Sequence, residues 1–166
     1  MFKKILRYTA LFLLAALVII QLFHPKKNRS EGPQPNYIGS SFHIPDDVTS
    51  IMAKACNDCH SNNTRYPWYA GFQPVHWWLN KHIKNGKKQI NYDEYNNRPL
   101  RYQYHKMEET IEMVKEGKMP LNSYTWTHKD ARLTDEERSK ITGWAQSIMD
   151  TLKARHPIDS LIRRKN

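Results

Sequence analysis

The chain contains only two cysteines, and they stand together in the pentapeptide Cys56-Asn57-Asp58-Cys59-His60. A C-x-x-C-H sequence is the attachment motif of c-type haem. Two thiols one helical turn apart can form thioethers with the two vinyl groups of one haem, and the adjacent imidazole then reaches the iron as its proximal ligand. The motif therefore predicts a fold built around one covalently attached haem c, held by Cys56, Cys59 and His60.

Three other uses of these residues compete with haem attachment. A disulfide would suit an oxidising compartment, but it leaves His60 without a role. A thioredoxin-like dithiol normally lies between a strand and a helix of a βαβ unit, and no such pattern surrounds Cys56. A zinc site needs a further histidine ligand, and the remaining histidines do not form the paired spacing of zinc-binding motifs.

The N-terminus has the pattern of an export segment. Three basic residues precede an apolar run from Tyr8 to Phe23. Such a pattern is typical of a signal sequence, and no small-residue cleavage site follows it. We therefore expect an uncleaved signal anchor over residues 1–23 that crosses the bilayer once, with a cleaved signal peptide as the alternative. Because covalent haem is attached outside the cytoplasmic membrane, the expected location is the inner membrane, with the haem domain facing the periplasm.

The formal net charge of +10 does not indicate nucleic-acid binding. Six of the 26 basic residues, but only one of the 16 acidic residues, lie before residue 40, so much of the excess charge flanks the apolar run. The remainder shows no focused basic patch of the kind that contacts nucleic acid. One group, Lys81, Lys84, Lys87 and Lys88, predicts either a solvated helix face or a docking site for an acidic redox partner.

Composition divides the rest of the chain into three parts. Residues 24–41 are polar and contain three prolines, which predicts a linker. A single haem-binding domain is expected over residues 42–154, because about this length is enough for one compact core. Residues 155–166 form a basic tail.

Helical signals dominate the domain. One helix is expected to begin at Asp46, with acidic residues in its first turn, and to lead into the haem motif. Others are expected over Pro74–Asn85, ending at Gly86, and over Tyr104–Glu116. A capping box at Thr134 begins the last helix, whose apolar residues recur at helical spacing. Strand-like alternation is absent, so the predicted class is all-α, with four or so helices around one haem.

An electron-transferring c-type haem usually has a second axial ligand, and a methionine thioether raises its potential. Met119 is the preferred candidate, since it lies in the loop sequence Gly117-Lys118-Met119-Pro120-Leu121, just after a helix end. Met107, Met113 and Met149 lie on helical stripes, where core packing is the usual role. His105 and His128 are the alternatives, and a haem without a strong sixth ligand would be a ligand-binding or catalytic centre.

Aromatic residues follow the motif closely. The segments Tyr66–Tyr69 and Trp77-Trp78 are expected to wall the haem and exclude water. Arg65, Trp68 and Trp126 are candidate hydrogen-bond donors to the haem propionates.

The order of these features resembles a class I cytochrome c, with a helix, C-x-x-C-H, further helices, a Met-Pro loop and a C-terminal helix. Four stretches resemble more specifically the small bacterial haem-binding domain family, at residues 56–69, 74–80, 117–124 and 133–138. The resemblance covers about residues 42–154. It implies haem bound through Cys56, Cys59 and His60 in a membrane-anchored or secreted protein.

The leading hypothesis is a membrane-tethered, exported mono-haem c-type cytochrome that exchanges electrons with a redox protein partner in the exported compartment. The alternative is a haem peroxidase, or the partner domain of a peroxidase, with an open or weakly ligated distal site. That chemistry needs an acid-base histidine, for which His105 and His128 are candidates. A haem-based sensor is a third hypothesis, although the sequence shows no transducer domain.

Overall fold

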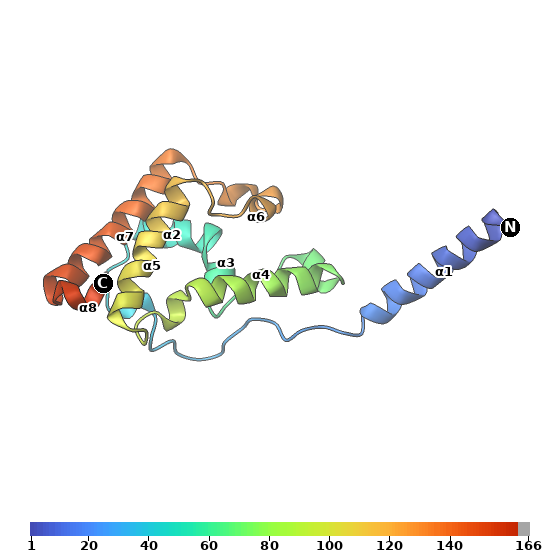
Figure 1. The fold of residues 1–166 in the computed structure, drawn as a ribbon, viewed down its shortest axis with the longest axis horizontal. Helices are drawn as coiled ribbons and strands as arrows, with labels where there is room; N and C mark the ends of the chain where they lie inside the picture. The colour runs from blue at the N-terminus through green and yellow to red at the C-terminus, as the bar shows by residue number, and fades with distance from the viewer. Residues whose placement is uncertain (163–166) are drawn as a thin grey trace.

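The structure, a computed structural model, describes residues 1–162, so the end of the expected basic tail (163–166) lies outside the described residues. Within this range the chain forms helices and no strand, which confirms the predicted all-α class (Figure 1). The α-helices are α1 (Phe2–Ile20), α2 (Asp46–Ala55), α3 (Asn57–His60), α4 (Val75–Gln89), α5 (Leu100–Lys115), α6 (Asn122–Thr127), α7 (Asp135–Arg155) and α8 (Ile158–Leu161). Short 3₁₀ helices are η1 (Ile38–Ser40), η2 (Trp68–Gly71), η3 (Tyr92–Glu94) and η4 (Lys129–Ala131).

The core forms where α5 and α7 lie side by side, with α2 packed against α7 (Figure 1). Met107 of α5 and Ile148 of α7 are fully buried there. Buried polar groups in this core are paired, as burial without a partner would be costly. The Tyr95 hydroxyl donates to the Gln103 carbonyl at 2.8 Å, and Trp144 Nε1 donates to the His43 carbonyl at 3.2 Å.

The two clearest helix signals in the sequence are confirmed. Thr134 Oγ1 accepts a hydrogen bond from the Glu137 N–H at 3.2 Å, and Glu137 Oε2 accepts one from the Thr134 N–H at 2.9 Å. This reciprocal capping box begins α7. Gly117 follows the end of α5 with φ at +68°, a conformation that glycine adopts without steric cost.

The predicted end of the second helix at Gly86 is wrong, because α4 continues through this residue to Gln89. Gly86 serves close packing instead. A Cβ added there would lie 2.6 Å from the Cys59 carbonyl oxygen and 3.1 Å from Cys59 Cβ. The glycine therefore lets α4 approach the backbone of the haem motif more closely than any other residue would allow.

Segments flanking the expected domain contribute to the same structure. Residues 24–41 run along the domain surface (Figure 1), and Ile38 is fully buried. Asn28 Nδ2 donates to the Ser61 carbonyl at 2.9 Å, and the Thr64 N–H donates to the Asn28 carbonyl at 3.0 Å. Leu161 of α8 is also buried. The loop after the haem motif is thus held partly by residues that precede it by more than 30 positions.

The helix α1 projects away from the rest of the protein, and none of its residues is buried (Figure 1). The sequence predicts a single transmembrane span here, and the structure does not support it. Among the helices of residues 1–162, none combines the length and the apolar character that crossing a bilayer requires.

We expect Gly86→Ala to destabilise the protein by about 1–3 kcal/mol, the usual range for overpacking, because its Cβ collides with the Cys59 backbone. Chemical denaturation followed by circular dichroism measures this change.

Gly143→Ala is the matched control. Gly143 lies inside α7 with nothing within 4 Å of an added Cβ, so alanine should stabilise the protein by up to about 1 kcal/mol. Equal effects of the two substitutions would contradict the packing role of Gly86.

Candidate functional site

The haem motif forms one tight turn at the joint between α2 and α3. The Cys56 N–H donates to the Met52 carbonyl at 2.9 Å and so ends α2. The Cys56 carbonyl then accepts from the Cys59 N–H at 3.2 Å and from the His60 N–H at 3.0 Å. This turn brings Cys56, Cys59 and His60 to the border of one cavity.

Two neighbouring cavities lie beside the motif, with volumes of about 270 and 260 Å³. The walls that they share are formed by Ala55, Cys56, His60, Gln89, Met119 and Pro120. The first cavity extends to Cys59 and Gly86. The second extends to both polar and apolar residues of α5 and to Ile141 of α7. Small-molecule and cofactor sites are typically concave, mostly apolar and roughly 300–1,000 Å³ in volume, and the pair of cavities together matches this description.

The His60 ring is oriented as a metal ligand. Its Nδ1 lies 3.0 Å from the Ile90 carbonyl oxygen. Because a carbonyl can only accept, Nδ1 carries the proton and Nε2 is left with a free lone pair. Burial lowers the pKa of His60, which keeps the imidazole neutral. A hydrogen bond from the second ring nitrogen to a backbone carbonyl is the usual support of a metal-ligating histidine.

The two thiols are held in their protonated form. Burial raises the pKa of Cys56 to about 12 and that of Cys59 to about 11. Redox-active dithiols have the opposite property, a lowered pKa that produces a thiolate. Residues 1–162 contain no group of three or more histidine, cysteine or acidic side chains that could hold a bare metal ion. The donor set fits a haem better than it fits zinc or a dithiol.

Met119 borders the same two cavities as Cys56 and His60 of the motif. It stands in the loop between α5 and α6, with its N–H donating to the Met113 carbonyl at 3.1 Å. Its half-buried side chain borders both cavities, together with Cys56 and His60. The structure therefore brings together all four residues that the sequence singled out.

The alternative histidine ligands lie elsewhere. His105 is exposed on α5, and its Nε2 lies 3.1 Å from Glu109 Oε1. His128 stacks on the Tyr124 ring, with 4.2 Å between the ring centroids, and it borders a separate pocket. Neither histidine borders the two cavities that Met119 shares with His60.

The aromatic side chains also lie differently from the expected haem wall. Trp68 and Trp126 are 83% and 78% exposed, and neither borders the two cavities. The cavity wall instead contains Tyr92, which is buried, and Lys106 and Glu109, which form an ion pair. Sequence reasoning missed these three residues because they come from η3 and α5, distant in the sequence from the motif.

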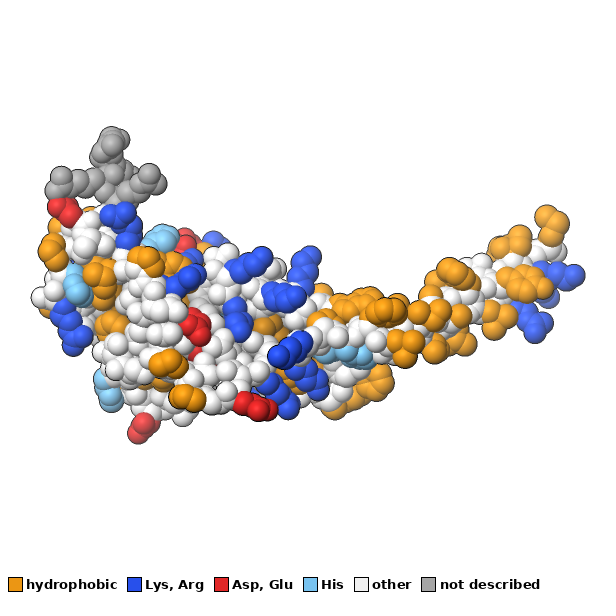
Figure 2. Space-filling view, turned by 90° about the horizontal axis from the view of Figure 1, so that it is seen from below, with side chains coloured by type: hydrophobic (Ala, Val, Ile, Leu, Met, Phe, Trp, Pro, Cys, Tyr) orange, Lys and Arg blue, Asp and Glu red, His pale blue; other side chains and the backbone are white. Residues whose placement is uncertain are grey.

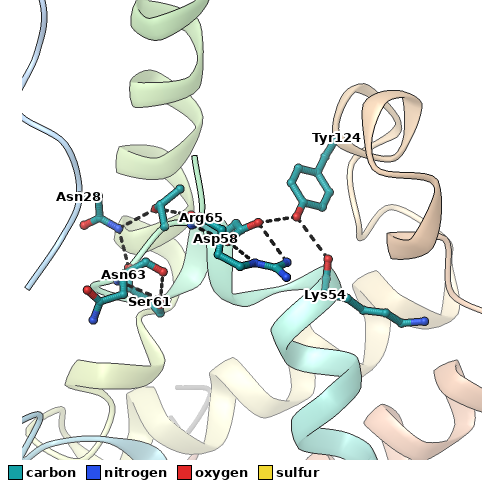
Figure 3. A network of polar contacts seen from close by, with 8 residues as sticks. Asn28, Lys54, Asp58, Ser61, Asn63, Arg65 and Tyr124 are labelled. Atoms are coloured by element: carbon teal, nitrogen blue, oxygen red, sulfur yellow. Dashed lines mark hydrogen bonds and ion pairs between the residues drawn. The ribbon is translucent and has the colours of Figure 1, made fainter. Parts of the chain in front are cut away.

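A buried carboxylate inside the motif links it to the Met119 loop (Figure 3). Asp58 is 6% exposed. Its Oδ1 accepts from the Arg65 N–H at 2.9 Å and from Arg65 Nε at 3.2 Å, and its Oδ2 accepts from the Tyr124 hydroxyl at 2.6 Å. We call Asp58, Arg65 and Tyr124 the Asp58 clasp. Tyr124 belongs to α6, directly after the Met119 loop, so the clasp fixes that loop against the motif.

The sequence carried only a weak signal for this clasp. An acidic residue at a variable position of the motif, with Arg65 seven residues later, suggests a local ion pair. Nothing in the local pattern indicates Tyr124, which lies 66 positions away from Asp58.

Comparison with known proteins agrees with this geometry. No curated protein and no solved structure matches the chain. A family model described as a haem-binding domain matches residues 15–147, which is well over half of the sequence. The matched region includes the motif, both cavities, the Asp58 clasp and most of α7. The chain therefore belongs to the haem-binding domain family.

Proposed function

We propose that this haem-binding protein carries one covalently attached haem c and transfers electrons one at a time. The observation that carries this proposal is that Cys56, Cys59, His60 and Met119 all border the first of the two cavities, and that three of them, all but Cys59, also border the second. When bound there, a haem would supply reversible one-electron chemistry at its iron.

Different residues of the chain would attach the haem covalently and bind its iron. The Cys56 and Cys59 thiols are the covalent attachment points. His60 Nε2 is the proximal ligand, oriented by the hydrogen bond from Nδ1 to the Ile90 carbonyl. The Met119 thioether is the distal ligand. Apolar neighbours such as Val114 and Ile141 keep water away, and exclusion of water is one of the ways in which a protein sets a redox potential.

Location and partners follow from the same proposal. Covalent haem attachment takes place outside the cytoplasmic membrane, so we propose an exported haem domain on the periplasmic side. The apolar helix α1 would attach it to the inner membrane.

The basic residues of α4 offer a docking site for a redox partner. Lys84, Lys87 and Lys88 border a surface groove of about 540 Å³, together with Lys26, Lys27 and Arg98. Such a concentration of positive charge speeds the encounter with an acidic protein. We propose that an acidic redox protein docks there, with α4 standing between it and the haem cavities.

The first test is an absorption spectrum of the protein exported together with the haem-attachment machinery. We expect a c-type pyridine haemochrome, with a weak band at about 695 nm in the oxidised form that reports methionine–iron ligation. Met119→Leu should abolish this band and lower the potential. Met107→Leu, a buried methionine outside both cavities, should change neither.

Two outcomes would contradict the proposal. A 695 nm band that survives Met119→Leu removes Met119 as the ligand. A high-spin spectrum, with ready carbon monoxide binding to the ferrous form, indicates an open site and favours ligand-binding or peroxidase chemistry over electron transfer.

Tyr124→Phe tests the Asp58 clasp. It removes a hydrogen bond to a buried carboxylate, so we expect a loss of about 1.5–3 kcal/mol of stability. The 695 nm band should also disappear at a lower temperature, because the Met119 loop is no longer tied to the motif.

Tyr102→Phe is the control for this substitution. The Tyr102 hydroxyl donates to the neutral Gln89 carbonyl at 2.7 Å at an exposed site. Loss of this hydrogen bond should lower the stability of the protein by about 1 kcal/mol or less, and it should leave the methionine–iron band unchanged. A band equally stable in both variants would show that the clasp does not position Met119.

A further inference from the structure

Most of the large exposed hydrophobic side chains among the described residues lie at one end of the protein. They cover α1 and continue onto the end of the domain that adjoins it (Figure 2). There Trp68 and Phe72, from η2 and its end, are 83% and 58% exposed, and Trp77 in the first turns of α4 is 39% exposed. We call these three residues the aromatic tip. Contiguous exposed apolar surface of this kind marks an interaction site.

Helix α1 is not long and apolar enough to cross a bilayer, but after Thr9 it lacks the polar face of a helix that packs on a water-soluble domain. Four consecutive residues, Leu11 to Leu14, are apolar and exposed, so apolar side chains point in every direction around the axis. A helix that is apolar all round needs an apolar environment on all sides. A lipid bilayer provides this, whereas one helix of a second chain would cover only one side.

Hydrogen bonds fix the aromatic tip against the end of α1. The Gln73 N–H donates to Gln21 Oε1 at 2.9 Å, and Gln21 Nε2 donates to the Gln73 carbonyl at 3.2 Å. The Phe23 carbonyl accepts from Gln73 Nε2 at 2.7 Å and from Trp77 Nε1 at 2.9 Å. Gln73 is buried, so these bonds are shielded from water. The tip is therefore carried at a defined position beside the point where α1 ends.

Charge at this end of the protein also fits a membrane surface. Residues 1–30 contain six basic residues and no acidic residue. Lys26 and Lys27 follow α1 directly and border the same basic groove as Lys84. Lysines beside an inserted segment are attracted by anionic lipid headgroups. Tryptophan is the residue most typical of the boundary between headgroups and acyl chains, because its ring is apolar and its N–H is polar.

We propose that the aromatic tip is a membrane-interface seat, in which Trp68, Phe72 and Trp77 enter the headgroup region of an anionic bilayer. The inference rests on the membrane attachment through α1 that forms part of the proposed function. The seat fixes the orientation of the haem domain, which would otherwise swing on a single helix. Helix α4 then rises from the tip, and its 1.5 Å per residue places Gly86, beside the motif, about 17 Å from Val75.

The test uses the full-length haem-loaded protein on vesicles of phosphatidylcholine and phosphatidylglycerol, recovered by flotation. Hydroxyl-radical footprinting with mass spectrometry then measures the labelling of individual side chains. Trp126 on α6 is an internal control, because it is 78% exposed, almost as much as Trp68, and borders a surface groove that contains no residue of the aromatic tip. We expect Trp68 and Phe72 to be labelled several-fold more slowly on vesicles than in detergent-free dilute solution, and Trp126 to be unchanged.

The double variant Trp68→Ala/Phe72→Ala should still float, because α1 is intact, but its Trp77 should be labelled faster on vesicles than Trp77 of the Trp126→Ala variant. Equal labelling of Trp68 and Trp126 on floated vesicles would overturn the seat while leaving attachment through α1 in place. Failure to float, with a cross-linked dimer in solution, would assign the surface to a second copy of the chain. A protein without a haem spectrum that still shows the footprint would contradict the electron-transfer function and support the seat.

Discussion

The buried carboxylate of Asp58 is the interaction on which the site depends. A charge removed from water is tolerated only when its oxygen atoms are paired, and here the partners come from two separate segments. Arg65 closes the loop after the motif, and Tyr124 draws in α6. Asn28 adds a third segment through Ser61 and Thr64 (Figure 3). Without the Asp58 carboxylate, Arg65 and Tyr124 would lose the acceptor that joins the motif to the segment after the Met119 loop.

Close packing against α4 also holds the haem motif in position. Gly86 lets α4 contact the Cys59 backbone, and this contact forms one wall of the cavity that the two thiols border. Ile90 follows the end of α4, and its carbonyl accepts the hydrogen bond that orients His60. One helix therefore positions both the covalent and the coordinating parts of the motif. The clasp and the glycine hold the same turn by different means, the clasp through hydrogen bonds and Gly86 through close packing.

Local patterns in the sequence were enough to predict that the four longer helices of the domain exist, but not α6 or α8, because such patterns depend on residues within one or two turns of each other. The capping box of Thr134 and Glu137 predicts the start of α7. The spacing of Cys56, Cys59 and His60 places these three residues on one turn. Gly86 was misread, since a glycine near a helix end has the same local signature whether it terminates the helix or permits a close contact. Trp68 was expected to wall the haem and is 83% exposed, because aromatic content predicts burial only when a neighbour is available to cover the ring. The pairing of Asp58 with Tyr124 depends on tertiary structure alone.

Helix α4 joins the separate proposals about this protein into one arrangement. Its residues His82, Asn85, Gly86 and Gln89 border the haem cavity, whereas Asn80, Lys84, Lys87 and Lys88 border the basic groove. The two sets alternate with helical spacing, so they occupy different faces of the same rod. Trp77, in the first turns, belongs to the aromatic tip. The proposed membrane seat, the proposed docking face and the cavities beside the motif are therefore held at constant separations by one rigid element. If the protein transfers electrons at a membrane surface as proposed, these constant separations would present the haem domain to its partner in the same orientation at each encounter.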